Sequence, residues 1–146
     1  MEKVTSSSLV ACTNFYNMNK ERLTELSEKL LEIPNMISQH QNQVLDLNEK
    51  IQIVQNEITQ TESVIKSEIS SQVDENGKKV YSNEVAREAA FVEASSTNSG
   101  LLDKKEILST FQRELNSERI KIEALGNEQK NIRSILYFFG GFEEAI

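Results

Sequence analysis

With 146 residues and a formal net charge of −7, the chain is long enough for one domain, and its net charge does not favour binding to DNA or an anionic membrane. Five glycines and one proline are too few turn residues for an all-β fold or a loop-rich enzyme. The composition therefore predicts an acidic all-α protein, and its single cysteine, Cys12, cannot form an internal disulfide.

The sequence shows no targeting or membrane-spanning pattern. We find no charged segment followed by the apolar core of a signal peptide, and no apolar run near the roughly 20 residues that a membrane-spanning helix needs. We therefore expect a cytoplasmic protein with no membrane partner.

The first 19 residues differ from the rest in being poor in charge and rich in Ser, Thr and Asn. We expect residues 1–19 to be flexible or loosely docked. Asn19 is a good N-cap, so the predicted helical domain covers residues 20–139, and residues 140–146 form a C-terminal tail. Cys12 has no histidine near it in the sequence, which favours an ordinary free thiol over a catalytic nucleophile.

A heptad repeat organises the chain from Leu23 to Ile65. Every seventh residue is Leu, Ile or Val, and most positions three further on are also apolar. This spacing keeps one apolar seam facing a partner helix in a left-handed coiled coil. A second series begins at Leu101 and runs towards the C-terminus. We expect these seam residues to form the coiled-coil and oligomer core: Leu30, Ile37, Val44, Ile51, Ile58, Ile65, Leu108, Leu115 and Ile122.

Two residues depart from the repeat. Pro34 removes a backbone donor, so we expect a kink or a tight break that preserves the direction of the helix. His40, at a seam position, is either a metal ligand or pH switch, or a polar residue that fixes the register or reaches solvent. No Cys, Asp or Glu stands three or four residues from it, which favours the second interpretation. We predict no metal site and no cofactor.

The pair Asn76-Gly77, which favours a type I′ turn, lies between short segments of β-compatible residues. We expect a β-hairpin tip over residues 71–82, with Val73 opposite Val80. A calcium loop is excluded because its first and last ligand positions lack acidic residues. The tip reverses the chain, and exposed tips are also where binding residues gather. The candidate interaction tip comprises Asn76, Gly77, Lys78, Lys79, Tyr81 and Arg87.

The segments before and after the tip are of similar length. We therefore expect an all-α fold in which they form a long antiparallel helical hairpin, paired as a coiled coil. In the alternative, the weak helix formers of residues 95–100 break the second arm, giving three helices with a short middle one. A lone hairpin buries little apolar surface per residue, so we expect a homo-oligomer.

Aromatic residues gather around a glycine pair near the end of the sequence. They either cap the open end of the bundle, against Phe15 and Tyr16, or form a binding patch, and we favour capping or oligomer packing. The candidate aromatic end comprises Tyr137, Phe138, Phe139 and Phe142.

A resemblance is carried by residues 77–84, with the sequence GKKVYSNE, by the helix rich in Arg, Glu and Ala that follows, and by residues 122–125, IEAL. In these features the second half of the chain resembles small helical-hairpin proteins of unassigned function that phages and prophages encode. The polar residues 95–100 depart from that pattern. The resemblance implies a small viral accessory or host-interaction protein, located in the host cytoplasm.

An enzyme is not expected, because one histidine, one cysteine and no glycine-rich phosphate loop offer little for catalysis. We expect a coiled-coil protein-interaction module with a protein partner, and the resemblance implies one that inhibits a host defence or replication protein. An alternative is an oligomer that captures a phosphate-bearing small molecule with Lys78, Lys79, Tyr81 and Arg87. Another is an accessory factor in single-stranded DNA metabolism. Nucleic acid is the least expected partner, because the basic residues of the second arm alternate with Glu and form no stripe.

Overall fold

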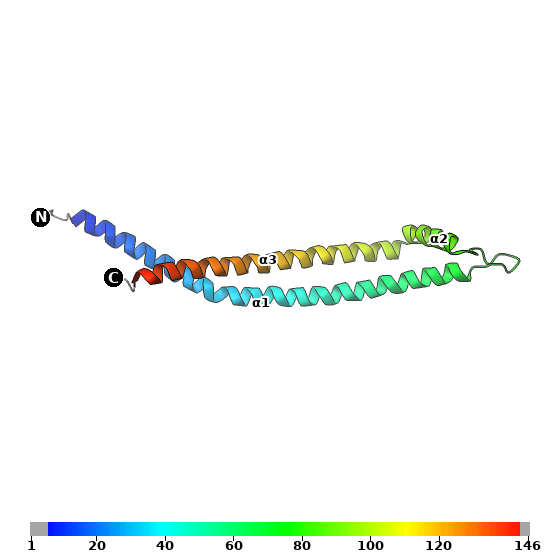
Figure 1. Ribbon diagram of the computed structural model, residues 1–146, viewed down its shortest axis with the longest axis horizontal. Helices are drawn as coiled ribbons and strands as arrows, with labels where there is room; N and C mark the ends of the chain where they lie inside the picture. Colours follow the sequence, from blue (N-terminus) through cyan, green and yellow to red (C-terminus); the bar gives the residue numbers. More distant parts are fainter. Residues whose placement is uncertain (1–5, 144–146) are drawn as a thin grey trace. The chain divides into compact units, whose positions relative to one another are not determined.

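The computed structural model describes the backbone of residues 6–143 and the side chains of residues 19–140, and most of this part of the chain is helical. Three helices follow one another: α1 (Ser6–Ser71), α2 (Glu84–Thr97) and α3 (Ser99–Glu143). Figure 1 shows α1 and α3 as the two long helices and α2 as the short one that follows the loop after α1. The prediction of an all-α protein is confirmed.

Helix α1 is longer than the sequence predicts. It begins at Ser6 rather than after Asn19, so most of the predicted N-terminal segment has a helical backbone. The expected loose docking of that segment concerns side chains outside the described residues. The helix also runs through Pro34 without a break, so the kink that we expected as the other outcome stays a prediction. Proline removes only one backbone donor, and the other backbone bonds of this 66-residue helix continue on both sides of it.

One compact unit of the fold combines residues 1–42 with Arg119–Ile146. Within it, Ile33 of α1 and Ile132 of α3 are buried. Nζ of Lys29 lies 2.5 Å from Oε1 of Glu128, so this unit joins a segment of α1 to a segment of α3.

A second compact unit spans Gln43–Glu118 and contains a cluster of buried aliphatic residues. Ile58, Ile65 and Ile69 of α1 meet Leu101 of α3 there, and Leu101 is completely shielded from solvent. Partly buried residues of α2 and of its entry loop pack against this cluster: Tyr81, Ala90, Phe91 and Ala94. Burial of these aliphatic side chains is the main stabilising contribution that the unit offers.

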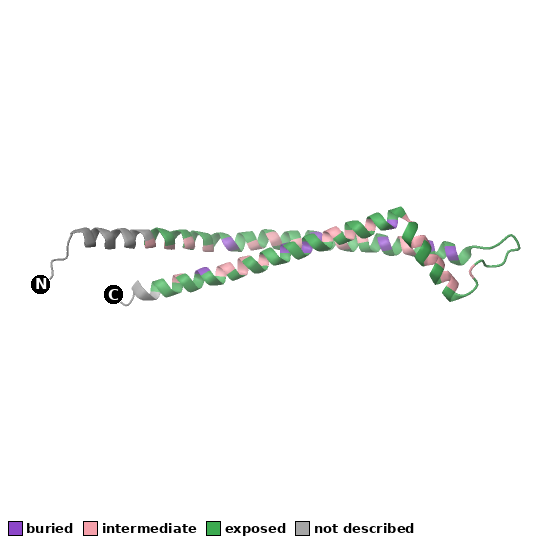
Figure 2. Cartoon of the chain, turned by 90° about the horizontal axis from the view of Figure 1, so that it is seen from above, coloured by how far each residue is buried: buried purple, intermediate pink, exposed green. Residues whose placement is uncertain are grey.

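The seam residues are shielded along both long helices. Between Leu23 and Ile65, every buried or half-buried residue except Glu62 belongs to one of the two series that form the heptad repeat, every seventh residue from Leu23 and the positions three further on. In Figure 2 the buried and half-buried positions recur at short intervals between exposed ones. Ile58, Ile65 and Leu115 are buried, whereas Leu30, Ile37, Val44, Ile51, Leu108 and Ile122 are half-buried.

The prediction of a β-hairpin tip over residues 71–82 is wrong. The described residues contain no β-strand, and the loop between α1 and α2 has one isolated β-bridge, between Val73 and Lys79. The register differs too, because Val73 was expected opposite Val80. A type I′ turn needs a positive φ at both central residues. Asn76 has no positive φ, since Gly77, at +74°, is the only described residue with one.

The side chain of Asp74 accounts for the different turn. Its Oδ1 accepts hydrogen bonds from the backbone nitrogens of Asn76 (2.9 Å) and Lys78 (2.8 Å), and its own backbone nitrogen donates to the oxygen of Lys78 (2.8 Å). Residues 75–77 therefore form the loop between the paired Asp74 and Lys78, with Gly77 in the left-handed region. Aspartate favours this arrangement because its short side chain bonds to backbone groups just ahead of it.

The second arm is broken, as the three-helix alternative predicts. Asn98 separates α2 from α3 and has an extended conformation, with φ −77° and ψ 103°. Its backbone nitrogen donates to the oxygen of Ala94 (3.1 Å), and its Oδ1 accepts from the nitrogen of Leu101 (2.9 Å). Asn98 thus caps the end of one helix and the start of the next.

Candidate functional sites

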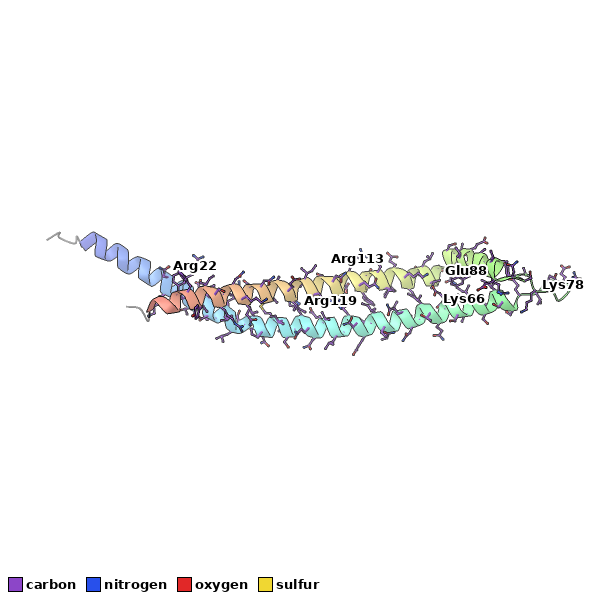
Figure 3. The ribbon with its side chains drawn as sticks, in the orientation of Figure 1. Arg22, Lys66, Lys78, Glu88, Arg113 and Arg119 are labelled. Atoms are coloured by element: carbon purple, nitrogen blue, oxygen red, sulfur yellow. The ribbon has the colours of Figure 1, made fainter. Side chains whose placement is uncertain are left out.

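The structure separates the residues of the candidate interaction tip. Asn76, Gly77, Lys78 and Lys79 are exposed in the loop, and Figure 3 shows Lys78 projecting from its outer end. The two other members of the set lie closer to the helices: Tyr81 is half-buried against the aliphatic cluster, and Nη1 of Arg87 donates to its backbone oxygen at 3.4 Å.

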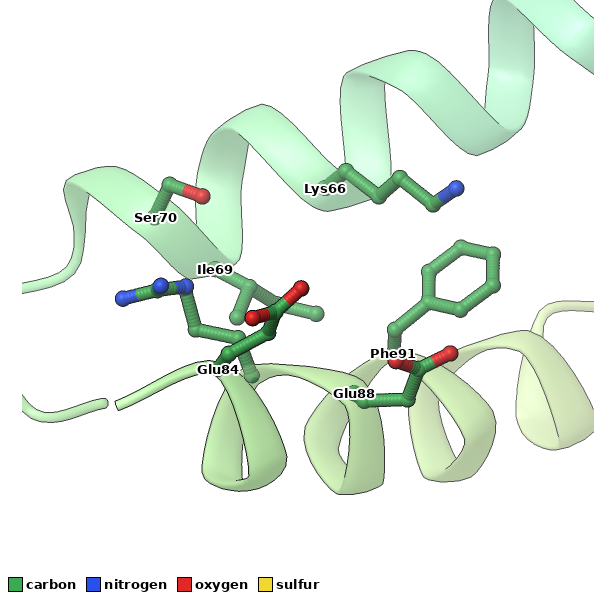
Figure 4. A pocket seen from close by; sticks show the side chains of 7 residues that line it. Lys66, Ile69, Ser70, Glu84, Glu88 and Phe91 are labelled. Carbon is green, nitrogen blue, oxygen red and sulfur yellow. The ribbon is translucent and has the colours of Figure 1, made fainter. Parts of the chain in front are cut away.

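A shallow groove of about 200 Å³ lies between the end of α1 and the start of α2. The ammonium of Lys66 lies 4.7 Å from the centre of the Phe91 ring, a cation–π contact. Figures 3 and 4 show Glu88 on the side of α2 that faces Lys66. In Figure 4, Glu84 lies on α2 next to Glu88, towards the start of the helix. The groove is lined by Lys66, Ile69, Ser70, Glu84, Arg87, Glu88 and Phe91.

This groove was not foreseen from the sequence, apart from Arg87. The signal was present in α2, where Glu84, Glu88 and Phe91 follow one another at helical spacing and so share a face. Two carboxylates and two cations line the groove. This balance of charge does not suit a phosphate in particular, and Lys78 and Lys79 do not line the groove.

The aromatic end is exposed. Tyr137, Phe138 and Phe139 follow one another near the end of α3 and are 85%, 61% and 42% exposed. The rings of Phe138 and Phe139 meet edge to face with their centres 5.6 Å apart. Phe142 lies outside the described side chains, as do Phe15 and Tyr16, the expected contacts of a cap. Neighbouring exposed aromatic side chains are typical of surfaces that bind other macromolecules.

His40, the only histidine of the chain, is half-buried at its seam position. Among the described residues no group of three or more His, Cys, Asp or Glu side chains could hold a metal ion. Cys12 lies outside the described side chains, so its expected role as an ordinary thiol stays a prediction.

Two basic residues of α3 are used in contacts with α1. Nζ of Lys104 lies 3.6 Å from Oε2 of Glu57 and donates to Oγ1 of Thr61 at 3.4 Å. Nζ of Lys105 lies 3.1 Å from Oε1 of Glu62. These lysines neutralise acidic neighbours within their own unit instead of adding to a basic surface.

Comparison of the chain with family models, with curated proteins and with solved structures finds no match. Within the described residues, no helix is apolar over a stretch long enough to cross a membrane.

Proposed function

We propose that this protein is a non-enzymatic coiled-coil module that binds another protein through its aromatic end. The observation that carries the proposal is the run of exposed aromatic residues at Tyr137, Phe138 and Phe139. Tyrosine and phenylalanine present a large, stiff contact surface at low cost in side-chain entropy, and tyrosine is frequent among the residues that dominate binding energy.

The charged contacts between α1 and α3 support an antiparallel coiled coil within each unit. With Leu23 and Leu101 at heptad position a, Lys29 and Glu128 both occupy position g. In the other unit, Glu62 and Lys105 both occupy position e. Contacts from g to g and from e to e are those expected of antiparallel helices, because parallel helices bring g of one helix beside e of the other.

The same unit supplies a further g-to-g pair. Lys50 and Glu114 occupy position g of α1 and α3, and Glu114 is among the groups that raise the pKa of Lys50, after its hydrogen bond and charge contact with Asp46. The aliphatic seam and its flanking charges therefore agree on one direction of pairing. A coiled coil of this kind has a narrow core and no enclosed cleft for catalysis, which is why we propose a binding role.

We propose that the protein is located in the cytoplasm and that it forms homo-oligomers through the seam and its flanks. We also propose that it binds a protein partner. In line with the resemblance to phage helical-hairpin proteins, we propose that the partner is a host protein and that binding inhibits it. Capture of a phosphate-bearing ligand and a role in single-stranded DNA metabolism are not proposed, because the groove has mixed charge and two lysines of α3 pair with glutamates.

The test is affinity capture with immobilised full-length protein, followed by mass spectrometry of the retained proteins. We compare the wild type with the double variant Tyr137→Ala/Phe138→Ala. The matched control is Val85→Ala/Val92→Ala, which removes exposed apolar side chains from α2 instead. Alanine raises helix propensity slightly at all four positions, so neither double variant should weaken its helix.

Wild type and control should retain the same protein, and the aromatic variant should lose about 2 kcal/mol of binding free energy, or about 30-fold in Kd. Equal affinity of the two double variants for that protein would exclude the aromatic end as the contact surface. Retention of no specific protein by the wild type would contradict the interaction module as a whole.

A further inference from the structure

We propose that Asn76 is a site of spontaneous covalent modification, at which the backbone nitrogen of Gly77 attacks the asparagine side chain and converts it to isoaspartate or aspartate. The site lies in the loop between α1 and α2, and it is independent of the proposed function.

The chemistry needs only water and a base from solvent. A base removes the proton of the Gly77 amide, and the nitrogen forms a bond to Cγ of Asn76. The bond from Cγ to the side-chain nitrogen then breaks, and ammonia leaves with a proton from solvent. Water opens the resulting succinimide ring at one of its two carbonyl carbons. The net change is loss of ammonia and gain of water, which leaves a side-chain carboxylate in aspartate, or an α-carboxylate in isoaspartate, whose backbone runs through Cγ.

The exposure of the loop and the small size of Gly77 favour this attack. Residues 71–80 are all exposed, so water and base reach both groups. Gly77 has no Cβ, and open space surrounds the position that a Cβ would occupy, so nothing crowds the nucleophile. One contact opposes the reaction: the nitrogen of Gly77 donates to the oxygen of Asp74 at 3.0 Å. Loss of one exposed hydrogen bond of this kind costs little, and slows the attack about fivefold.

The other asparagines followed by a small residue are held differently. Asn116 precedes Ser117 inside α3, where the backbone nitrogen that would attack is fixed in the helical hydrogen-bond ladder. Asn98 precedes Ser99, but its Oδ1 accepts the hydrogen bond that caps α3. The structure thus singles out Asn76 among these three positions.

The product changes the tip in two ways. A new carboxylate appears beside Asp74 and Glu75, which adds one negative charge to a short loop. Isoaspartate also inserts a methylene into the backbone between Asp74 and Lys78, so the two bonds to Oδ1 of Asp74 cannot both keep their geometry. The exposed lysines of the loop are then presented differently in aged molecules.

The test is incubation of the full-length protein at mildly alkaline pH, with samples taken over time for peptide mapping by mass spectrometry. The peptide that contains Asn76 should gain the mass difference between a carboxylic acid and an amide, and isoaspartate-specific methylation should label it. The peptide with Asn116 is the internal control and should stay unchanged over the same period. The rate at Asn76 should rise with pH, because the attacking nitrogen must lose its proton.

Two comparisons make the result decisive. In Asn76→Gln the longer side chain disfavours ring closure, so this peptide should stay unmodified. The rate at Asn76 in the folded protein should lie within about fivefold of its rate in urea-unfolded protein, since one exposed hydrogen bond opposes it. The proposal is overturned if Asn76 reacts no faster than Asn116, or if folding protects it many times more than fivefold.

Discussion

Replacement of Leu101 by alanine should destabilise the unit that spans Gln43–Glu118 more than any single change on its surface. Leu101 is 0% exposed and joins α3 to three isoleucines of α1. The variant removes three carbon groups, worth roughly 2.4 kcal/mol at about 0.8 kcal/mol each. A cavity adds to this, within the range of about 2–5 kcal/mol for such changes. We expect about 3 kcal/mol, because partly buried neighbours can close some of the space.

The neighbouring residue provides the control. Leu102 is 48% exposed, so Leu102→Ala removes the same atoms from the same helix with little loss of burial. It should change the free energy of unfolding by no more than about 0.5 kcal/mol. Both variants gain slightly in helix propensity.

The assay is urea denaturation followed by far-ultraviolet circular dichroism. All variants are compared at one protein concentration, since self-association would link stability to concentration. The denaturation midpoint should fall for Leu101→Ala with little change in the slope m. Equal midpoints for the two alanine variants, or a loss below about 1 kcal/mol at Leu101, would refute the burial that the fold assigns to it.

Three further outcomes follow from polar contacts. Ser95→Ala should raise stability by about 1 kcal/mol in thermal denaturation, because its buried hydroxyl has no hydrogen-bond partner among the described residues. The control Ser96→Ala loses a bond to a backbone oxygen and should gain less. Asn83→Ala should cost about 1 kcal/mol and speed amide exchange at the start of α2, because its Oδ1 caps that helix; unchanged exchange would contradict the cap. The hydrogen bond that Nζ of Lys50 donates to Asp46 raises the pKa of Lys50 above its ordinary value of 10.5, so the ammonium charge and the stability from this pair persist at neutral pH and are lost only as the pH rises through the raised pKa. NMR titration should show a lower pKa for Lys50 in Asp46→Asn, and an unchanged value would exclude Asp46 as the cause.

The shielding of the seam positions was predictable because one physical rule governs it. Apolar residues such as Ile58 stand at every seventh position where the same face of a helix is shielded along its length. In the structure, every predicted seam residue is at least half-buried. The heptad repeat indicates a continuous helix even where a single residue suggests a helix boundary. The good N-cap at Asn19 does not mark the start of α1, which begins at Ser6, and Pro34 does not interrupt the helix.

The tip and the break were harder to predict because each depends on one side chain. Asn-Gly suggests a two-residue turn, but Asp74 bonds to two backbone nitrogens ahead of it and selects a longer loop. Among the weak helix formers of residues 95–100, only Asn98 interrupts the helices, because its amide serves as a cap. The composition of a segment indicates that a break is possible, whereas its position depends on these bonds.

The candidate sites were also difficult to predict from the sequence, because they depend on how the helices pack. The exposure of Tyr137 and Phe138 depends on what packs against the end of α3, which the spacing of residues in the sequence does not encode. The groove between α1 and α2 depends on Lys66 meeting Phe91 across a chain reversal. Contacts between residues far apart in the sequence need the fold to bring them together.

Site-specific photocrosslinking tests the central claim most directly. A photoreactive phenylalanine analogue replaces Tyr137 in the full-length protein, and Ile120, an exposed residue of the same helix, provides the control position. If the aromatic end is the contact surface, irradiation with the partner present should yield one major protein adduct from position 137 and little from position 120. Equal adducts from both positions, or none from position 137, would contradict the account.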